Sequence, residues 1–349
     1  MAAEVLATAG VEVTLLERMP SVGRKLLLAG RGGLNLTHSE PLDSLLDRYG
    51  AARRFLEPAI RSFPPDGLRA WCADLGQEPF VGTSGRVFPS GFRATPLLRA
   101  WLRRLDDLEV DIRTRNEWNG VLDGVTVLAL GGASWPRTGS NGAWTSALSD
   151  VDIVPYAPSN CGFHVDWSPV FRERFAGTPV KDVRVTFEDT SSRGDVVITT
   201  TGVEGGPIYA LSSRMRDADD RTIEIDLRPD MVEVAVDARP KDSRSTALRR
   251  AGFAPIAAAL LRETGSDDPK HVRLRCGEPM PIDRAISSAG GIATHEVDET
   301  FMLRKHPGTF VAGEMLDWEA PTGGYLLQAT FSTAVAAARG ALAYVGEHL

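Results

Sequence analysis

The sequence of 349 residues predicts an α/β fold of the nucleotide-binding kind that is interrupted by a β-rich insert. Near the N-terminus, residues 1–9 favour a helix, Gly10 favours its end, and residues 11–17 alternate and finish on an acidic residue. A helix, a glycine, a strand and a terminal carboxylate form the second half of a βαβ dinucleotide-binding unit. Two glycine-rich segments far apart in the sequence, and short alternating runs in the middle of the chain, support the rest of this prediction.

The first half of that βαβ unit, a strand followed by G-x-G-x-x-G, is missing from the sequence. Residues 11–16 and 125–130 would normally flank this strand and bond to it. Unpaired backbone groups in the slot left between them would cost about 1–3 kcal/mol each. We therefore expect that the natural protein starts upstream of Met1, or that this form is marginally stable and holds its cofactor poorly.

A first glycine-rich segment, residues 30–38, follows a basic turn and a short apolar stretch. Arg24 and Lys25 lie in the turn predicted for residues 19–25, and residues 26–29 lead into the glycines. Positive side chains beside a glycine-rich loop suit a diphosphate, because charge-assisted hydrogen bonds to phosphate are strong. The alternative is a basic turn that is only exposed to solvent.

Helices and strands alternate between this segment and the middle of the chain. Apolar periodicity predicts helices over residues 41–61, 66–75, 97–105 and 141–148. Alternation predicts strands over residues 109–113 and 121–130, the second of them buried. That second strand ends in Gly131 and Gly132, where the backbone can pass close to a cofactor or form a tight turn.

From Tyr156 the pattern changes to short alternating runs separated by turn residues, which indicates an antiparallel β region. These runs cover residues 180–187, 196–201 and 221–227. Residues 243–264 are predicted to be helical, and residues 276–282 are expected to extend the sheet. Residues 287–292 return the chain to the first domain. The glycines of residues 202–207 are interpreted as turn residues first and ligand contacts second.

The second glycine-rich segment lies near the end of the chain, between a short strand over residues 310–312 and a long helix over residues 326–345. Gly313 and Glu314 follow the strand, and Gly323 and Gly324 precede the helix. Two glycines at a helix N-terminus let a ligand approach the backbone and leave free N–H groups. A carboxylate at the end of a strand suits the hydroxyl groups of a sugar. The alternative is a capped helix that follows a surface loop.

The composition is that of a soluble globular protein, with 43% hydrophobic and 24% charged residues. A net charge of -7 counts against nucleic acid as a main partner. Cys72, Cys161 and Cys276 are too far apart for a C-x-x-C motif and indicate a reducing compartment. The six histidines show no metal-binding spacing, so no metal is expected. No apolar run approaches the ~18 residues of a membrane span and no leader is visible, so we expect a cytoplasmic protein.

Several segments, spread in order along nearly the whole chain, match one known family. They are Pro20-Ser-Val-Gly-Arg-Lys25, Gly30-Arg-Gly-Gly-Leu-Asn-Leu-Thr-His38, Gly85-Arg-Val-Phe-Pro89, Leu128-Ala-Leu-Gly-Gly-Ala-Ser-Trp-Pro-Arg-Thr-Gly139, Gly202-Val-Glu-Gly-Gly-Pro-Ile-Tyr209, Ala285-Ile-Ser-Ser-Ala-Gly-Gly291 and Gly313-Glu-Met-Leu-Asp-Trp-Glu-Ala-Pro-Thr-Gly-Gly-Tyr325. Each segment is weak by itself, but together they are specific. The chain resembles the BaiN/YhiN-like bacterial flavoproteins, some of which are similar to aminoacetone oxidase.

The resemblance implies a discontinuous FAD-binding domain of the glutathione-reductase type, with a Rossmann-like α/β fold. Its two parts would be residues 1–155, which lack the N-terminal strand and glycine motif, and residues 287–349. Residues 156–286 would form an inserted β-rich domain that carries a small helical piece. The chain departs from the family in its missing start and in a short segment at residues 115–124.

The resemblance also implies which residues contact FAD. Glu17 would hold the adenosine ribose, and Glu314, next to Gly313, would hold the ribityl chain. The diphosphate and the flavin would lie against Arg24, Lys25, Gly30, Gly32, Gly33, Asn35, Leu36 and Thr37. A second pass of the backbone along the cofactor would use Gly131 and Gly132. The pyrimidine edge of the flavin, where a helix dipole stabilises negative charge on the reduced ring, would face Gly323, Gly324, Tyr325 and Leu326.

The implied function is that of an FAD-dependent oxidoreductase. The flavin would carry hydride from a reduced nicotinamide, NADH or NADPH, or from a small-molecule substrate to an acceptor. Catalytic residues are not assigned, since His38 and Tyr325 are expected near the flavin as packing or hydrogen-bonding residues. Two alternatives stay open: a truncated, flavin-free remnant without catalysis, and a flavoprotein that acts on RNA.

Overall fold

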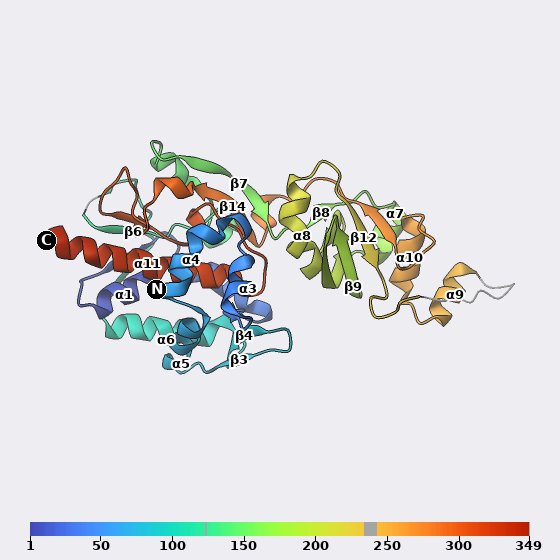
Figure 1. Cartoon of the computed structure of the whole chain (residues 1–349), viewed down its shortest axis with the longest axis horizontal. Helices are drawn as coiled ribbons and strands as arrows, with labels where there is room; N and C mark the ends of the chain where they lie inside the picture. Colours follow the sequence, from blue (N-terminus) through green and yellow to red (C-terminus); the bar gives the residue numbers. More distant parts are fainter. Residues whose placement is uncertain (123, 234–242, 349) are drawn as a thin grey trace. The chain divides into compact units, whose positions relative to one another are not determined.

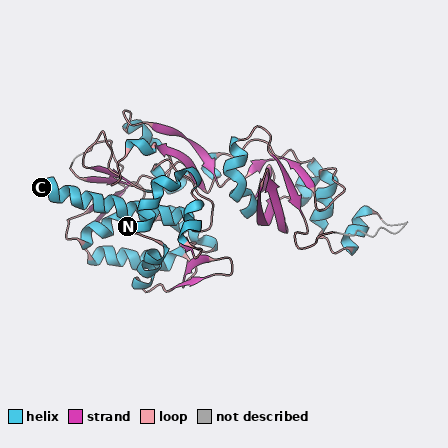
Figure 2. Ribbon diagram, viewed as in Figure 1, coloured by secondary structure: helices cyan, strands magenta, loops and turns pink. Residues whose placement is uncertain are grey.

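The chain forms two compact units, Met1–Ala157 with Ser287–Leu349, and Pro158–Ile286 (Figure 1). The computed structural model describes residues 1–122, 124–233 and 243–348. The first unit, called unit 1 here, mixes helices with several short sheets, and the second, unit 2, is organised around one larger antiparallel sheet (Figure 2). Among the described helices, none combines the length and the apolar composition needed to cross a membrane.

Unit 1 contains short strands and one long helix. Its strands are β1 (Thr14–Glu17), β2 (Thr37–His38), β3 (Pro79–Val81), β4 (Arg86–Pro89), β5 (Asp111–Thr114), β6 (Thr126–Leu128), β7 (Ile153–Ser159), β14 (Ser287–Ile292) and β15 (Thr309–Val311). Its α-helices are α1 (Ala2–Thr8), α2 (Arg24–Ala29), α3 (Leu42–Asp47), α4 (Arg53–Ser62), α5 (Pro65–Asp74), α6 (Ala94–Asp107) and α11 (Tyr325–His348). Single 3₁₀ turns are η1 (Gly30–Gly32), η2 (Gly50–Ala52), η3 (Pro136–Thr138), η4 (Ala143–Ala147), η6 (Thr294–Glu296) and η7 (Gly313–Met315).

The strands of unit 1 form four small sheets. Parallel ladders join β1 to β5 and β6 to β15, while β2, β4 and β3 form an antiparallel sheet and β7 pairs with β14. In the described part of the chain, β1 and β6 each have a ladder partner on one side only. Leu16 of β1 is 52% exposed, which is unusual in a parallel sheet. The expectation of a further strand between β1 and β6 stays a prediction.

Helix α11 runs through unit 1 and packs against α1, α4 and β15 (Figure 1). Small residues make this possible, because a side chain no larger than alanine lets neighbouring backbones approach closely. Ala337, Ala338 and Ala341 are fully buried, and an added Cβ at Gly340 would lie 2.7 Å from the carbonyl oxygen of Thr300. The helix is therefore the centre of the unit 1 core.

A buried carboxylate fixes α1 to α5 and α6. Glu4 is 7% exposed and accepts hydrogen bonds from the indole Nε1 of Trp71 at 3.0 Å and of Trp101 at 2.6 Å. Arg104 of α6 donates a third bond at 3.1 Å and supplies the opposite charge. A buried charge needs such partners because an isolated ion is costly to remove from water.

Several predicted elements of unit 1 differ in the structure. The helix expected over residues 41–61 is broken into α3, η2 and α4, because Gly50 has a positive φ of 50°. Only Thr126–Leu128 of the strand expected over residues 121–130 forms, and Val121 is 61% exposed. Residue 123 of that segment lies outside the described residues. Arg24 and Lys25 do not lie in a turn but begin helix α2.

Unit 2 has six strands, β8 (Phe163–His164), β9 (Pro179–Phe187), β10 (Thr190–Ile198), β11 (Gly202–Glu204), β12 (Thr222–Asp226) and β13 (Val272–Arg275). They pair in the order β13-β12-β9-β10-β11-β8. The helices of this unit are α7 (Pro169–Phe175), α8 (Gly206–Asp217), α9 (Arg244–Arg250) and α10 (Pro255–Glu263), with the 3₁₀ turn η5 (Ile282–Arg284). The single helix expected over residues 243–264 is thus two helices, separated at Gly252, which has a φ of 82°.

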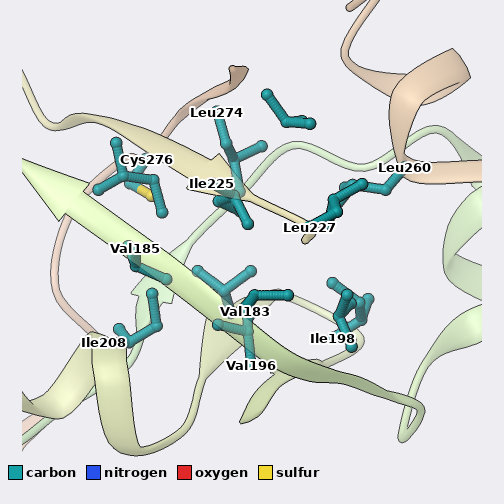
Figure 3. Close-up of a cluster of buried hydrophobic side chains, with 14 of the residues drawn as sticks. Val183, Val185, Val196, Ile198, Ile208, Ile225, Leu227, Leu260, Leu274 and Cys276 are labelled. Atoms are coloured by element: carbon teal, nitrogen blue, oxygen red, sulfur yellow. The ribbon is translucent and has the colours of Figure 1, made fainter. Parts of the chain in front are cut away.

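The two outer strands of this sheet are joined, so the sheet curls toward closure. Gly277, just after β13, donates from its backbone N–H to the carbonyl of His164 in β8 at 2.7 Å. Phe163 of β8 also forms an isolated antiparallel β-bridge with Pro279. Alternation along the strands directs the apolar side chains to the inside, where helix α10 also contributes (Figure 3). The labelled side chains Val183, Val185 and Ile225 belong to this core.

Candidate cofactor site

The two glycine-rich segments, nearly 300 residues apart, meet in unit 1. Gly324 has a φ of 108°, and a Cβ added to it would lie 2.5 Å from the carbonyl carbon and oxygen of Thr37. Gly323 has a φ of 126°. The segment before α11 therefore packs directly against the end of the loop that holds residues 30–37, and both glycines are required by the conformation of the chain.

Close packing by protein atoms accounts for two glycines of the first loop, and the contact of this loop with a cofactor stays a prediction. A Cβ at Gly30 would lie 2.5 Å from the Cβ of Ala94, and one at Gly33 would lie 2.5 Å from the ring of Phe92. Gly32 faces open space, and Leu36 is fully buried in the core. Sequence reasoning attributed these positions to the cofactor, but close packing against α6 and its preceding residues already requires glycine at two of them.

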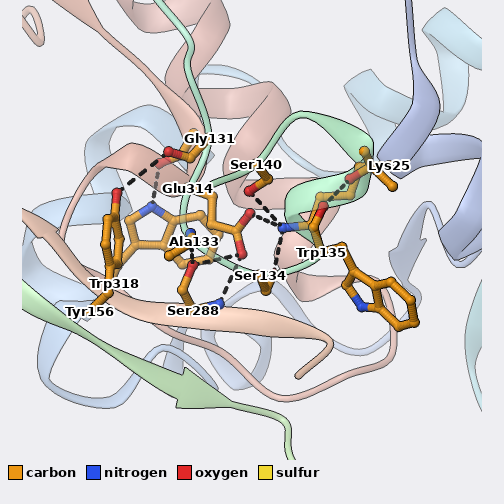
Figure 4. A network of polar contacts seen from close by, with 12 residues as sticks. Lys25, Gly131, Ala133, Ser134, Trp135, Ser140, Tyr156, Ser288, Glu314 and Trp318 are labelled. Carbon is orange, nitrogen blue, oxygen red and sulfur yellow. Dashed lines mark hydrogen bonds and ion pairs between the residues drawn. The ribbon is translucent and has the colours of Figure 1, made fainter. Parts of the chain in front are cut away.

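A charged cluster joins the first and last parts of unit 1 (Figure 4). The Lys25 ammonium contacts the Glu314 carboxylate and donates to the hydroxyl of Ser134 at 2.7 Å and of Ser140 at 3.3 Å. The other carboxylate oxygen of Glu314 accepts from the backbone N–H of Ser288 at 2.9 Å and from its hydroxyl at 3.2 Å. Both predicted charged residues are thus held in place, with side chains 29% and 16% exposed.

Gly131 and Gly132 lie beside this cluster, as Figure 4 shows for Gly131. A Cβ at Gly132 would collide with the hydroxyl of Ser288 at 1.9 Å and would lie 3.1 Å from the carboxyl carbon of Glu314. The carbonyl of Gly131 accepts a hydrogen bond from the indole of Trp144 at 2.8 Å. The backbone after β6 therefore passes close to Glu314, and the contact of Gly131 and Gly132 with a cofactor stays a prediction.

Glu17 stands apart from the charged cluster. It ends β1, is half-buried, and accepts from the backbone N–H of Met19 at 2.8 Å. The neighbouring Arg18 donates to the carbonyl of Gly139 at 3.2 Å, which links this strand end to the loop that follows Gly132. Within the described residues, Glu17 has no contact with Lys25 or Glu314, so its role at the ribose stays a prediction.

Several buried polar atoms at the predicted site have no partner in the described part of the protein. They are Nε of Arg24, Oδ1 of Asn35 and Oγ1 of Thr37. Thr37 is fully buried, and an unsatisfied buried polar group costs about 1–3 kcal/mol. Polar atoms in such positions fit a cofactor that carries hydroxyl, phosphate and carbonyl groups. The residues present are therefore compatible with FAD.

Sequence reasoning missed the polar network that fixes the first residue of α11. The hydroxyl of Tyr325 donates to Glu40 at 2.6 Å, and Arg48 holds both oxygens of that carboxylate at 3.3 and 2.8 Å. Tyr49 donates to the carbonyl of Tyr325 at 2.8 Å, and the ring of His38 stacks on that of Tyr325. Burial would raise the pKa of Glu40, but the hydrogen bonds from Arg48 and Tyr325 outweigh it and lower that pKa. The only signal in the sequence was the position of Glu40 two residues after His38.

The cysteines lie outside this site. Cys72, Cys161 and Cys276 are buried and unpaired, and burial raises the pKa of Cys72 and of Cys276 to about 12. These two thiols are therefore protonated and unreactive at neutral pH. Within residues 1–122, 124–233 and 243–348, no group of His, Cys, Asp or Glu side chains is arranged to hold a metal ion.

We expect Lys25 and Glu314 to stabilise unit 1 cooperatively. A double-mutant cycle compares the unmodified chain with Lys25→Met, Glu314→Gln and the double variant by urea unfolding. The coupling free energy between the two side chains should be about 1–2 kcal/mol, because the pair is largely shielded from water. The exposed pair Arg113 and Asp111 serves as the control, with an expected coupling below about 0.5 kcal/mol. Equal coupling in both cycles would show that the cluster is not held more tightly than a surface ion pair.

Comparison with known proteins identifies the class. The model of the family described as HI0933-like protein Rossmann domain matches residues 1–340, so the chain belongs to this family of Rossmann-type flavoproteins. It is 23% identical over 384 residues to a 3-dehydro-bile acid delta(4,6)-reductase of Clostridium scindens, covering 95% of this chain and 92% of that relative. The chain is a flavin-dependent oxidoreductase, in agreement with the function predicted from the sequence.

Two further proteins are similar to this chain. A ribosomal RNA dihydrouridine synthase of Escherichia coli is 23% identical over 391 residues, covering 96% of this chain and 93% of that protein. Among solved structures, the quinol fumarate reductase subunit FrdA of E. coli is 13% identical with a TM-score of 0.49, covering 99% of this chain and 68% of that chain.

Proposed function

We propose that the chain reduces an unsaturated carbonyl compound of low molecular weight, with FAD as the bound flavin and NADH or NADPH as the electron donor. The relative from C. scindens is named as a reductase of a bile acid, which supports a substrate of this kind. In the balanced reaction, the donor and one proton are consumed, one carbon–carbon double bond is reduced, and the oxidised nicotinamide is released. The bound flavin would accept hydride from the nicotinamide and deliver it to the substrate.

The residues of the chain would hold the cofactor as follows. Lys25 and Glu314 would bind the sugar-phosphate chain, because both charges already converge with the hydroxyls of three serines. The free N–H groups at the start of α11 would face the pyrimidine edge, where a helix N-terminus favours negative charge. Glu17 would bind the adenosine ribose. The observation that carries this proposal is a set of buried polar atoms without a partner among the described residues. Two of them belong to Asn35 and Thr37 of the first glycine-rich segment, and the third belongs to Arg24 at the start of α2.

The test has two stages. The chain is purified with excess FAD, and flavin absorbance is measured after gel filtration. Bound flavin is then mixed anaerobically with NADH or NADPH, and afterwards with an unsaturated ketone. We expect bleaching by one nicotinamide and recovery of the oxidised spectrum with the ketone. A folded protein that retains no flavin would support the flavin-free alternative, and bleaching without recovery would reject the proposed substrate.

Reduction of a uridine in RNA is the second candidate. The E. coli relative, similar at the same identity, is named as a ribosomal RNA dihydrouridine synthase. The net charge of -7 counts against it, because binding to phosphate backbones depends on positive charge. Adding ribosomal RNA in place of the ketone in the second stage separates the two candidates. We also propose a reducing compartment, the cytoplasm, which the unpaired cysteines support.

A further inference from the structure

An exposed aromatic cluster lies on the antiparallel sheet of unit 1. Phe80 of β3 and Phe88 of β4 are direct ladder partners, with ring centroids 5.6 Å apart. The ring of Phe92 lies 4.7 Å from that of Phe88. Phe80 is 44% and Phe92 is 43% exposed. Clustered exposed rings are costly in water and mark sites where a ligand or partner binds.

The cluster is fixed to the loop that carries the first glycine-rich segment. The ring of Phe92 covers the bare Cα of Gly33, where a Cβ would be only 2.5 Å from it. The backbone N–H of Leu34 donates to the carbonyl of Phe92 at 2.9 Å, and that of Leu36 donates to Val87 at 2.9 Å. The aromatic surface is therefore a rigid continuation of the candidate cofactor site.

Arg86 connects this surface to the start of α11. It lies two residues before Phe88 on β4 and thus on the same face of the strand. Its Nε would be 3.6 Å from a Cβ added to Gly323, and the ring of Tyr325 would be 3.3 Å from the same atom. Arg86 makes no ion pair or side-chain hydrogen bond with any residue that the structure describes. In a chain of net charge -7, a cation without a carboxylate partner at this point favours an anionic ligand.

We propose that this face binds the substrate of the flavin reaction, and that the substrate is a flat, mainly apolar molecule with one carboxylate or other anionic oxygen group. The apolar body lies on Phe80, Phe88 and Phe92, and the anionic group bonds to Arg86. This inference rests on the proposed function, since it places the substrate beside the segment that faces the flavin. The aromatic rings supply affinity for any flat apolar molecule, and Arg86 supplies the selection for charge.

The experiment measures dissociation constants with two acids and their methyl esters. 3-Oxochol-4-en-24-oic acid represents a steroid with an unsaturated ketone, and pyrenebutyric acid represents a flat aromatic compound. For the FAD-loaded chain, we expect at least one acid to bind about tenfold more tightly than its ester. Arg86→Met should abolish this difference, and Arg86→Lys should keep part of it. Phe80→Ser should weaken acid and ester alike by about threefold or more. The acid that binds more tightly shows whether a steroid or a planar aromatic compound fits this face better.

Matched controls come from unit 2. Arg273→Met removes an exposed arginine without an ion pair among the described residues, and Val170→Ser removes an apolar side chain that is 75% exposed. Neither should change binding. Phe80 is itself exposed, so Phe80→Ser should fold, and thermal unfolding verifies this for every variant.

The inference is overturned if Arg86→Met leaves the preference for acid over ester unchanged in protein that has full flavin content. It is also overturned if neither acid binds the FAD-loaded chain. Weaker binding of an RNA oligonucleotide by the same variants, or conversion of a dimer of this chain to a monomer in gel filtration, would then assign the face to that partner instead. Absence of bound flavin in the unmodified chain would instead reject the proposed function, so the two failures are distinguishable.

Discussion

The variant Gly324→Val is expected to lower the melting temperature of unit 1 by roughly 10 °C and to lose most of its flavin. The new Cβ would lie 2.5 Å from the backbone of Thr37, which is fully buried and cannot move aside. The φ of 108° adds backbone strain of about 1–3 kcal/mol for a residue with a branched side chain. A total cost of about 3–5 kcal/mol corresponds to that shift for a unit of this size.

Gly10→Val is the control for strain alone. Gly10 has a φ of 83°, but nothing lies within 4 Å of an added Cβ. Differential scanning calorimetry and the ratio of flavin to protein absorbance are measured for both variants. The collision with Thr37 should make Gly324→Val clearly worse than the control. If both variants lose the same stability, the contact between the two glycine-rich segments does not hold the site together.

Glu4→Ala is expected to lower the free energy of unfolding of unit 1 by about 3 kcal/mol, the largest effect on stability after that of Gly324→Val. The carboxylate accepts hydrogen bonds from Trp71, Trp101 and Arg104. Its removal therefore leaves two indole N–H groups and a guanidinium N–H without this acceptor. Each buried donor left unpaired costs about 1–3 kcal/mol, and water that enters the space recovers part of this. Alanine favours a helix, so the loss does not come from α1 itself.

Urea unfolding followed by tryptophan fluorescence measures this effect, because two of the donors are themselves the probes. Glu12→Ala is the control, since Glu12 is exposed and should change stability by no more than about 0.5 kcal/mol. Glu4→Gln should keep part of the stability, as an amide oxygen still accepts from one indole. A loss below about 1 kcal/mol in Glu4→Ala would mean that α1 is not fixed by this carboxylate.

The regular parts of the fold were predictable because their periodicity is strong. The alternation that predicted strands over residues 180–187 and 221–227 corresponds to β9 and β12, and the apolar run before Gly313 corresponds to β15. The break at Gly50 was not predicted, because periodicity continues across a single glycine with positive φ. Val121 was expected to be buried for a similar reason: hydrophobicity alone does not show whether a strand has a partner.

The candidate site was predictable where local sequence carries the signal. Lys25 and Glu314 each stand beside glycines, and the structure brings them into contact. Arg48 and Glu40 were not found, because their partner Tyr325 is 285 residues from Glu40 in the sequence. The sequence also did not reveal that Gly33 makes room for the ring of Phe92. A single sequence does not distinguish a glycine that close packing requires from one that a bound ligand requires.

The place of unit 2 within the sequence affects how the protein folds during synthesis. All six strands of unit 2 lie between residues 163 and 275, so its sheet can form as soon as this segment leaves the ribosome. In unit 1, by contrast, Thr126 of β6 pairs with Thr309 of β15. At synthesis rates of about 5–20 residues per second, β6 waits roughly ten seconds to half a minute for its partner. During that time, the apolar side chains of β6 and the part of the unit 1 core that α11 will cover lack their partners. We therefore expect these segments of the nascent chain to need protection from aggregation.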